Sequence, residues 1–167
     1  MKYIDFTAFA LVLSVFVASC AEQPQQKQLQ QTPKQPAVFH KSHESAKAAL
    51  PFSDIVQAGN FWYLSGQIGM DHKSRTLVAG GIGAETTQTL ENIKQVLEHH
   101  GLSMKEVIKV TVILDDMSDF SSFNEIYSAY FPQKPARTTF AADSLAMGAA
   151  VEIEVVAFGG ETRSTDN

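Results

Sequence analysis

The pattern of apolar and polar positions predicts a folded segment with strands at both ends and two helices within it. Short runs of alternating or β-branched residues predict strands, and apolar residues spaced three or four apart predict helices. Gly59 and Asn60 suit a tight hairpin, and Gly101 suits a left-handed helix end. The predicted strands are residues 53–58, 61–66, 107–114, 137–142 and 149–158, and the predicted helices are residues 84–101 and 118–131.

This order of elements predicts an α+β fold, with a mixed β-sheet and two helices packed on one face. The opposite face needs cover as well. Adjacent apolar pairs, such as Phe61 with Trp62 and Val155 with Val156, must point to opposite faces of their strands. An exposed apolar sheet face is typical of an interface, so we expect a closed homo-oligomer.

The N-terminal residues form a separate pattern. The run from Phe6 to Val17 is largely apolar; it is shorter than the roughly 20 residues that span a bilayer, but it suits the apolar region of a secretory signal. Ala18 and Ser19 before Cys20 resemble a bacterial lipobox. We therefore expect residues 1–19 to be a lipoprotein signal peptide and Cys20 to be lipidated. An ordinary cleaved signal and a buried N-terminal helix also fit this pattern.

The next segment is rich in Gln and Pro and has almost no large apolar residues. Such a segment cannot bury enough surface to fold, so residues 20–38 are predicted to be a tether; a glutamine-rich interaction segment is the alternative. The folded domain is expected at 39–161 and a short tail at 162–167. Together these assignments predict an exported protein, lipid-anchored to a bacterial membrane on its periplasmic face, with the outer membrane favoured.

Charge and cysteine content exclude several classes of function. The net charge is −5 and no Lys/Arg stripe is present, so nucleic acid is not an expected partner. The single cysteine excludes an internal disulfide framework and a cysteine-based zinc site. The five histidines show no spacing typical of metal ligands. We expect neither a metal nor an organic cofactor.

Three charged residues stand in predicted strands of the C-terminal half. Arg137 begins one strand, and Glu152 and Glu154 lie two residues apart on the last strand, so they share a face. Arg137 could form an ion pair between subunits, with Glu152 as one possible partner, and the glutamates could simply face solvent on an edge strand. A site that binds a small anion is the functional alternative.

Several motifs carry a resemblance to a known family. The segments "SGQIG", "NIKQVLEHHGLSMKEVIKVTVIL", "DMSDFSSFNEIYSAYF" and "PARTTF…VEIEVVAF" resemble the Rid/YjgF family of reactive-intermediate deaminases, and the likeness covers residues 50–158. It implies a chorismate-mutase-like α+β fold and a homotrimer with three clefts between subunits.

The resemblance also implies roles for individual residues. Arg137 matches the arginine that binds the substrate carboxylate, a task suited to the planar guanidinium fork. Glu152 matches the acid that positions and activates a water. Ser65 matches a serine that could hydrogen-bond substrate or water, and Asn124 matches an asparagine that is a polar contact or a structural support.

Two positions depart from the common pattern of that family. Phe52 stands where a tyrosine is frequent, so the ring is kept without its hydroxyl, and packing is the alternative role. Thr139 stands two residues after the arginine, where a cysteine is frequent. These departures affect the expected substrate preference rather than the charge chemistry.

The reaction that the resemblance implies is hydrolytic deamination of enamine or imine acids, such as 2-aminoacrylate and 2-iminopropanoate, to 2-keto acids and ammonia. Arg137 would hold the substrate and Glu152 would place the water, as in a 2-iminobutanoate/2-iminopropanoate deaminase. Export would separate the protein from the cytoplasmic source of these imines. A non-catalytic trimeric lipoprotein with a ligand-binding or chaperone-like role is therefore the alternative.

Overall fold

The computed structural model describes residues 35–47 and 49–159 of the 167-residue chain. The predicted signal peptide at 1–19, Cys20, most of the predicted tether and the predicted tail at 162–167 lie outside the described residues. Within the described ranges, no helix combines the length and the apolar character needed to cross a membrane.

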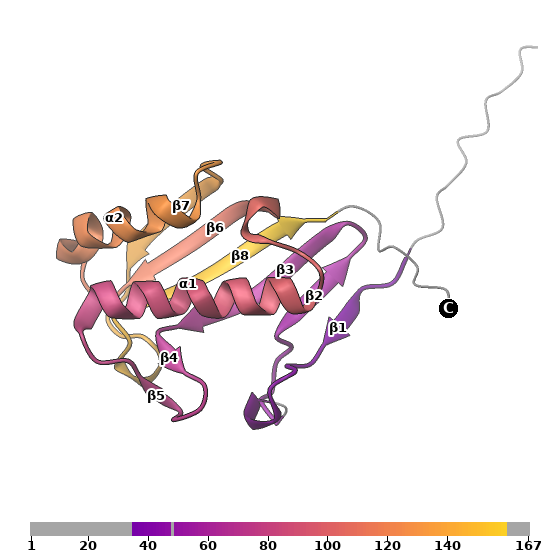
Figure 1. Cartoon of the computed structure of the whole chain (residues 1–167), viewed down its shortest axis with the longest axis horizontal. Helices are drawn as coiled ribbons and strands as arrows, with labels where there is room; N and C mark the ends of the chain where they lie inside the picture. The colour runs from indigo at the N-terminus through magenta and orange to yellow at the C-terminus, as the bar shows by residue number, and fades with distance from the viewer. Residues whose placement is uncertain (1–34, 48, 160–167) are drawn as a thin grey trace, which may run out of the picture. The chain divides into compact units, whose positions relative to one another are not determined.

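A six-stranded mixed sheet forms the main layer of the fold (Figure 1). Its order is β1-β2-β3-β8-β6-β7; β6 and β7 run parallel, and every other pair is antiparallel. The strands are β1 (Val38–His40), β2 (Ile55–Ala58), β3 (Phe61–Ile68), β6 (Val107–Leu114), β7 (Ala136–Ala141) and β8 (Val151–Phe158). A separate short hairpin is formed by β4 (Met70–Asp71) and β5 (Thr76–Leu77).

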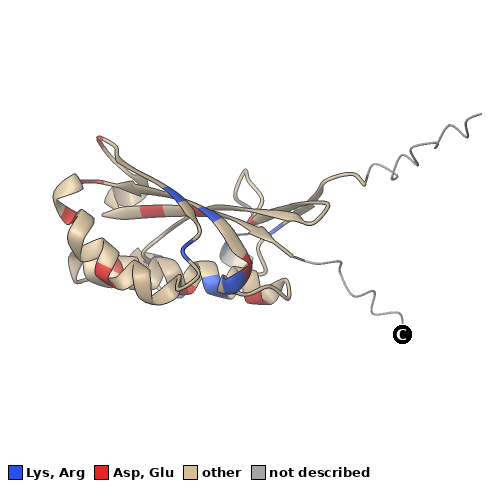
Figure 2. Ribbon diagram, turned by 90° about the horizontal axis from the view of Figure 1, so that it is seen from above, with Lys and Arg blue, Asp and Glu red and all other residues tan. Residues whose placement is uncertain are grey.

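Two helices cover one face of this sheet, α1 (Gly81–His99) and α2 (Phe120–Tyr130). Figure 2 shows both helices on the same side of the strands. The α+β fold predicted from the sequence is thereby confirmed, including the two helices on one face and every predicted strand and helix, with shifts of a few residues at the ends. The strand β1 and the β4-β5 hairpin were not predicted.

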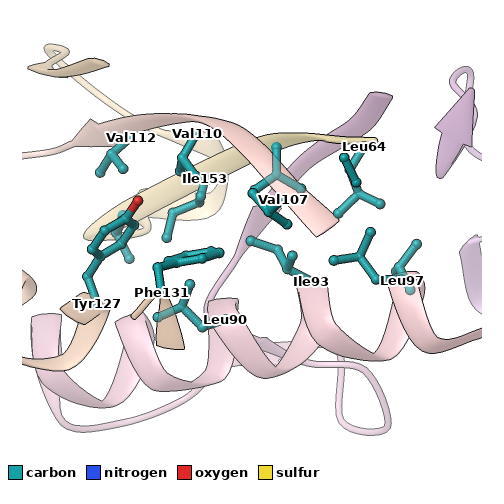
Figure 3. Close-up of a cluster of buried hydrophobic side chains, with 14 of the residues drawn as sticks. Leu64, Leu90, Ile93, Leu97, Val107, Val110, Val112, Tyr127, Phe131 and Ile153 are labelled. Atoms are coloured by element: carbon teal, nitrogen blue, oxygen red, sulfur yellow. The ribbon is translucent and has the colours of Figure 1, made fainter. Parts of the chain in front are cut away.

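The hydrophobic core lies between the helices and the sheet (Figure 3). Leu90, Ile93 and Leu97 extend from one face of α1, as their spacing predicts, and all three are fully buried. They pack with Val110 and Ile153 of the central strands. Burying such side chains stabilises the fold by roughly 1.5–3 kcal/mol each.

On the second face of the sheet, the described residues place no α-helix and expose large apolar side chains. Phe61, Tyr63 and Phe158 are each 41–48% exposed, and Phe61 and Phe158 pack edge to face at 5.1 Å. Trp62, by contrast, is 5% exposed. The predicted alternation of neighbouring apolar residues between the two faces is therefore confirmed.

Two pairs of histidines from distant parts of the sequence come together where β1 meets the end of α1. His40 stacks on Trp62 at 5.6 Å and lies 4.7 Å from His100, and His43 stacks on His99 at 4.2 Å. Burial first, and the neighbouring histidines His40 and His99 next, lower the pKa of His100 to about 4. The packing of these rings fixes β1 against the domain, a contact that residue spacing alone did not predict.

Candidate active site

A cavity of about 310 Å³ opens beside the end of β3, and Glu152 lines it. Glu152 lies on β8 opposite Ile68 of β3 and points away from the helices, because its neighbours Val151 and Ile153 are buried in the core. Phe52, 53% exposed, also lines the cavity. The structure thus brings Glu152 and Phe52, both predicted site residues, to one cavity.

Gly66 explains how the Glu152 carboxyl reaches this position. A Cβ atom at Gly66 would overlap the carboxyl group of Glu152, so only glycine leaves room for that side chain to lie across β3. The register of β3 against β8 also shifts between Leu64 and Gln67, an irregularity typical of functional sites. The "SGQ" segment is therefore shaped to receive this carboxylate.

The environment of Glu152 favours its protonated form. Burial raises the pKa of Glu152, and the negative charge of Glu154, on the same face of β8, raises it further. A carboxyl group with a raised pKa in a cavity is a candidate general acid or base.

The segment that follows β3 forms another wall of the cavity and is fixed by α1. The Asn92 side-chain amide donates to the carbonyl oxygens of Ile68 and Met70 at 3.1 and 3.0 Å. A Cβ at Gly69 would lie 2.6 Å from the Glu85 Cα, so glycine permits the close approach of this segment to the helix. Met70 and the β4-β5 hairpin are thereby held beside the cavity.

Arg137 is placed elsewhere, on the edge strand β7 beneath α2. Its Nη1 donates to Asn124 Oδ1 at 2.8 Å, and its guanidinium lies 4.6 Å from the centre of the Tyr127 ring. The Phe120 and Phe123 rings are within 5.7 Å. These contacts orient the guanidinium. The hydrogen bond to Asn124 uses only one of the five N–H donors of the guanidinium group.

Arg137 and Glu152 therefore lie on opposite faces of the same sheet. On β6, Arg137 is paired with the core residue Val110, and Glu152 is paired with Ile113. Val110 and Ile113 are three residues apart on this strand, so they and their partners point to opposite faces. Among the described residues, no ion pair includes either Arg137 or Glu152. A single chain thus does not bring the two predicted catalytic residues together.

The remaining predicted site residues have defined positions. Asn124 contacts Arg137, as described above. Thr139 follows Arg137 by two residues on β7, so the two side chains point to the same face. The buried hydroxyl of Thr139 has no hydrogen-bond partner among the described residues. Ser65 Oγ donates to the Ser53 carbonyl at 2.7 Å and is not among the residues that line the cavity. In the single chain Ser65 has a structural contact.

Sequence reasoning missed a group of polar residues on the cavity wall. We define the Lys47 cluster as Lys47, Glu44, Asp54, Gln67 and His72. Lys47, Asp54 and Gln67 are at most 8% exposed, and Lys47, Asp54, Gln67 and His72 line the cavity. Asp54 directly precedes the strand at 55–58, and Gln67 belongs to the "SGQIG" motif. Their spacing along the chain did not show that they meet the other three members, which stand outside the predicted elements. In the part of the chain that is described, no group of three or more His, Cys, Asp or Glu side chains is arranged to hold a metal.

Comparison with known families identifies the class of this protein. Residues 42–158 match the family model described as Endoribonuclease L-PSP. The chain belongs to this family, which is the Rid/YjgF family that the sequence motifs predicted.

Named relatives and solved structures agree with this assignment. The chain is 42% identical to the 2-iminobutanoate/2-iminopropanoate deaminase of Mus musculus over 71% of this chain and 90% of the relative. It is 46% identical to a RutC family protein of Pyrococcus horikoshii over 65% of this chain and 86% of the relative. The crystal structure of the E. coli YjgF gene product superposes with a TM-score of 0.66 at 30% identity, covering 72% of this chain and 98% of that one.

The relatives contradict the predicted localisation. Several are named 2-iminobutanoate/2-iminopropanoate deaminase, the Arabidopsis thaliana relative is named as chloroplastic, and none of those compared above is named as a lipoprotein. The prediction of an exported, membrane-anchored lipoprotein was therefore wrong. It rested on a short apolar run and the small residues before Cys20, and short motifs of this kind often occur without the function they resemble.

Proposed function

We propose that this protein hydrolyses 2-imino acids to 2-keto acids and ammonia, with Glu152 as the group that activates water. The observation that carries this proposal is the partly buried Glu152 carboxyl, which lines a cavity of about 310 Å³ and has a raised pKa. Relatives that are about 40% identical are named 2-iminobutanoate/2-iminopropanoate deaminase. Family and site chemistry thus support the same reaction.

The working unit is a homotrimer whose clefts lie between subunits. The helix-free face exposes Phe61, Tyr63 and Phe158, and a second copy of the chain would cover this apolar surface. The edge strand β7 carries Arg137 on the opposite face from Glu152. Packing of the β7 edge of one copy beside the cavity of the next places the two charges in one cleft.

The chemistry divides between these two residues. The Arg137 guanidinium binds the substrate carboxylate through two parallel hydrogen bonds. The Glu152 carboxylate takes a proton from water as the water oxygen attacks the imine carbon, and the imine nitrogen gains a proton. The proton that nitrogen gains is the one that Glu152 took from water. Glu152 then takes the hydroxyl proton of the tetrahedral intermediate and passes it to nitrogen, so the carbon–nitrogen bond breaks, ammonia leaves and the keto group forms.

The other predicted residues support this arrangement. Asn124 orients Arg137 through the 2.8 Å hydrogen bond, and the Phe52 ring provides an apolar wall for the substrate. The Thr139 hydroxyl lies on the same face of β7 as Arg137 and is buried without a partner among the described residues. Ser65 maintains the backbone beside Glu152 through its bond to Ser53.

Ribonuclease activity, which the family description names, is less well supported by the residues of this chain. The net charge is −5, whereas binding the phosphate backbone of RNA calls for a basic surface. A non-catalytic ligand-binding role has no observation in its favour beyond the cavity itself. Absence of imine hydrolysis would favour this non-catalytic role.

The direct test measures hydrolysis of 2-iminopropanoate by the full-length chain. The imine is generated in situ from alanine by an amino-acid oxidase, and pyruvate formation is followed with and without the protein. Formation of pyruvate above the uncatalysed rate, proportional to protein concentration, supports the proposal. A rate equal to that in buffer, together with measurable binding of pyruvate, would favour a ligand-binding protein.

Replacement of Glu154 by glutamine should move the acid limb of the pH–rate profile to lower pH by a few tenths of a unit. Glu152 must be ionised to accept a proton, so the rate falls as pH falls through its raised pKa. Removing the negative charge of Glu154 lowers that pKa, because the two glutamates repel each other. The measurement is kcat/KM against pH at low ionic strength, since salt screens this exposed charge.

Glu98→Gln is the matched control, because Glu98 is an exposed residue on α1 outside the cavity. Its profile should coincide with that of the unmodified chain. An acid limb that does not move in Glu154→Gln would mean that Glu152 is not the group whose ionisation limits the rate.

A further inference from the structure

The edge strand β1 (Val38–His40) is short and buries little apolar surface. All three of its residues pair with β2, and the Asp54 amide donates to the His40 carbonyl at 3.0 Å. Val38, which shares a face with His40, is 46% exposed. Elements with few buried apolar contacts open at a low cost in free energy. The docking of β1 therefore depends strongly on the contacts of the His40 ring.

These contacts belong to the histidine cluster, which we define as His40, His43, His99 and His100. The cluster joins β1 and the segment after it to the end of α1. His40 is paired with Ile55 of β2, which in turn is paired with the buried core residue Leu64 of β3. Paired residues share a face, so the His40 ring lies on the face that packs on α1. The apolar face that a second copy would cover is the opposite one.

A proton on His100 is unfavourable in this arrangement. Burial first, and His40 and His99 next, lower the pKa of His100 to about 4. Asp54 acts in the opposite direction, and His43 lowers the pKa further. The groups that act on His100 thus come from β1, from the segment after it, from the end of α1 and from the segment before β2. Only the acid among them favours the charged form of His100.

His40 gives a second reason, which rests on geometry alone. Its Nε2 is buried and has no hydrogen-bond partner among the described residues. A charged imidazole carries an N–H on both nitrogens. A protonated His40 would therefore bury a donor without an acceptor, which is costly. The docked position of β1 suits an imidazole without a proton on Nε2.

We propose that the histidine cluster is an acid-sensitive latch, which holds β1 and the segment 41–47 against the end of α1 at neutral pH and releases them when its rings are protonated. Lys47, at the end of this segment, lines the cavity beside Glu152. Release would therefore free one wall of the candidate active site. The latch is tested through the structure rather than through turnover, so the test does not depend on the proposed function.

The direction of the pH effect follows from proton linkage. Between the ordinary pKa of 6.5 and the lowered value of about 4, a released His100 binds more protons than a docked one. Docking therefore has its full strength above about pH 7, weakens as the pH falls through 6.5, and weakens no further below about pH 4. Solvent screens part of the charge on this half-buried ring, so we expect the docking equilibrium to fall about tenfold between about pH 7 and pH 5.

Hydrogen exchange of the full-length chain measures this equilibrium at the two pH values, after correction for the intrinsic effect of pH on exchange. The protection of the Asp54 amide, which bonds the His40 carbonyl, should fall about tenfold between about pH 7 and pH 5. Amides between β6 and β8 should keep their protection, because they lie in the centre of the sheet. The same peptides are compared at both pH values.

The substitution His100→Phe keeps an aromatic ring beside His40 and Trp62 but cannot take up a proton. Its Asp54 protection should change by less than about threefold over the same pH range. Glu98→Gln is the matched control, because Glu98 is exposed in the last turn of α1 and is not among the groups that act on His100; it should keep the full response. If His100→Phe does not fold, His100→Gln replaces it, and the response of the unmodified chain is measured in either case.

Three results would overturn the latch. The first is a response below about threefold in the unmodified chain, and the second is an equal response in His100→Phe and the unmodified chain. The third is a loss of protection that extends to the amides between β6 and β8, because acid would then unfold the whole domain. None of these results involves imine hydrolysis, so failure of the latch leaves the proposed function in place, and absence of turnover leaves the latch in place.

Discussion

Replacement of Arg137 by alanine should lower kcat/KM for 2-iminopropanoate by roughly 10²–10³-fold. In the proposed cleft this guanidinium makes two charge-assisted hydrogen bonds to the substrate carboxylate, and their loss corresponds to about 3–4 kcal/mol of transition-state stabilisation. The substrate is small, so this contact provides much of its orientation. The measurement is the initial rate of pyruvate formation over a range of imine concentrations.

Two controls separate substrate binding from folding. Arg137 packs over the Tyr127 ring and bonds Asn124, so its loss should lower the free energy of unfolding by about 1 kcal/mol; thermal unfolding and the size of the oligomer measure this effect. Arg137→Lys keeps the charge but not the planar fork, and its activity should fall between those of alanine and arginine. Activity of the alanine variant within about threefold of the unmodified chain would mean that another group holds the carboxylate.

The sequence was sufficient to predict most elements of the fold because their patterns are local. The spacing of Leu90, Ile93 and Leu97 follows the helical period, and the run at 107–114 is β-branched throughout most of its length. The strand β1 has three residues and the strands β4 and β5 have two each. These elements are too short to show a period, and they exist because partners elsewhere in the chain pair with them.

The site was predictable only in part, for a related reason. Alternation along one strand places Glu152 with Glu154, and Arg137 with Thr139, but it does not relate the face of one strand to the face of another. That relation depends on register, which pairs Arg137 with Val110 and Glu152 with Ile113. The separation of the two catalytic candidates to opposite faces became visible only in the structure.

The Lys47 cluster illustrates the same limit more strongly. Lys47 lies in a short 3₁₀ helix (Ser45–Lys47), whereas Gln67 is near the end of β3. Nothing in the spacing of these residues predicts that they meet. Only the packing of the segment before β2 onto the end of β3 creates the cavity wall that they share.

Replacement of Glu152 by glutamine should lower kcat for 2-iminopropanoate by roughly 10²–10⁴-fold, the range expected for loss of a positioned general base. Glutamine has nearly the same shape, so it should occupy the space over Gly66, but it cannot accept a proton from water. KM should change little, because in the proposed cleft Arg137, not Glu152, holds the substrate carboxylate. Single-substrate kinetics at several pH values measure both effects, and the residual rate should lose the acid limb that Glu152 ionisation produces.

Glu154→Gln is the matched comparison for this variant, since it changes the same chemical group two residues away on the same face of β8. At a pH well above the acid limb it should retain nearly full activity, because Glu154 affects the reaction only through the pKa of Glu152. A Glu152→Gln variant that keeps more than about a tenth of the activity would contradict the role of Glu152. If instead both variants lose activity equally, the negative potential of this face, rather than proton transfer at one carboxylate, would govern the reaction.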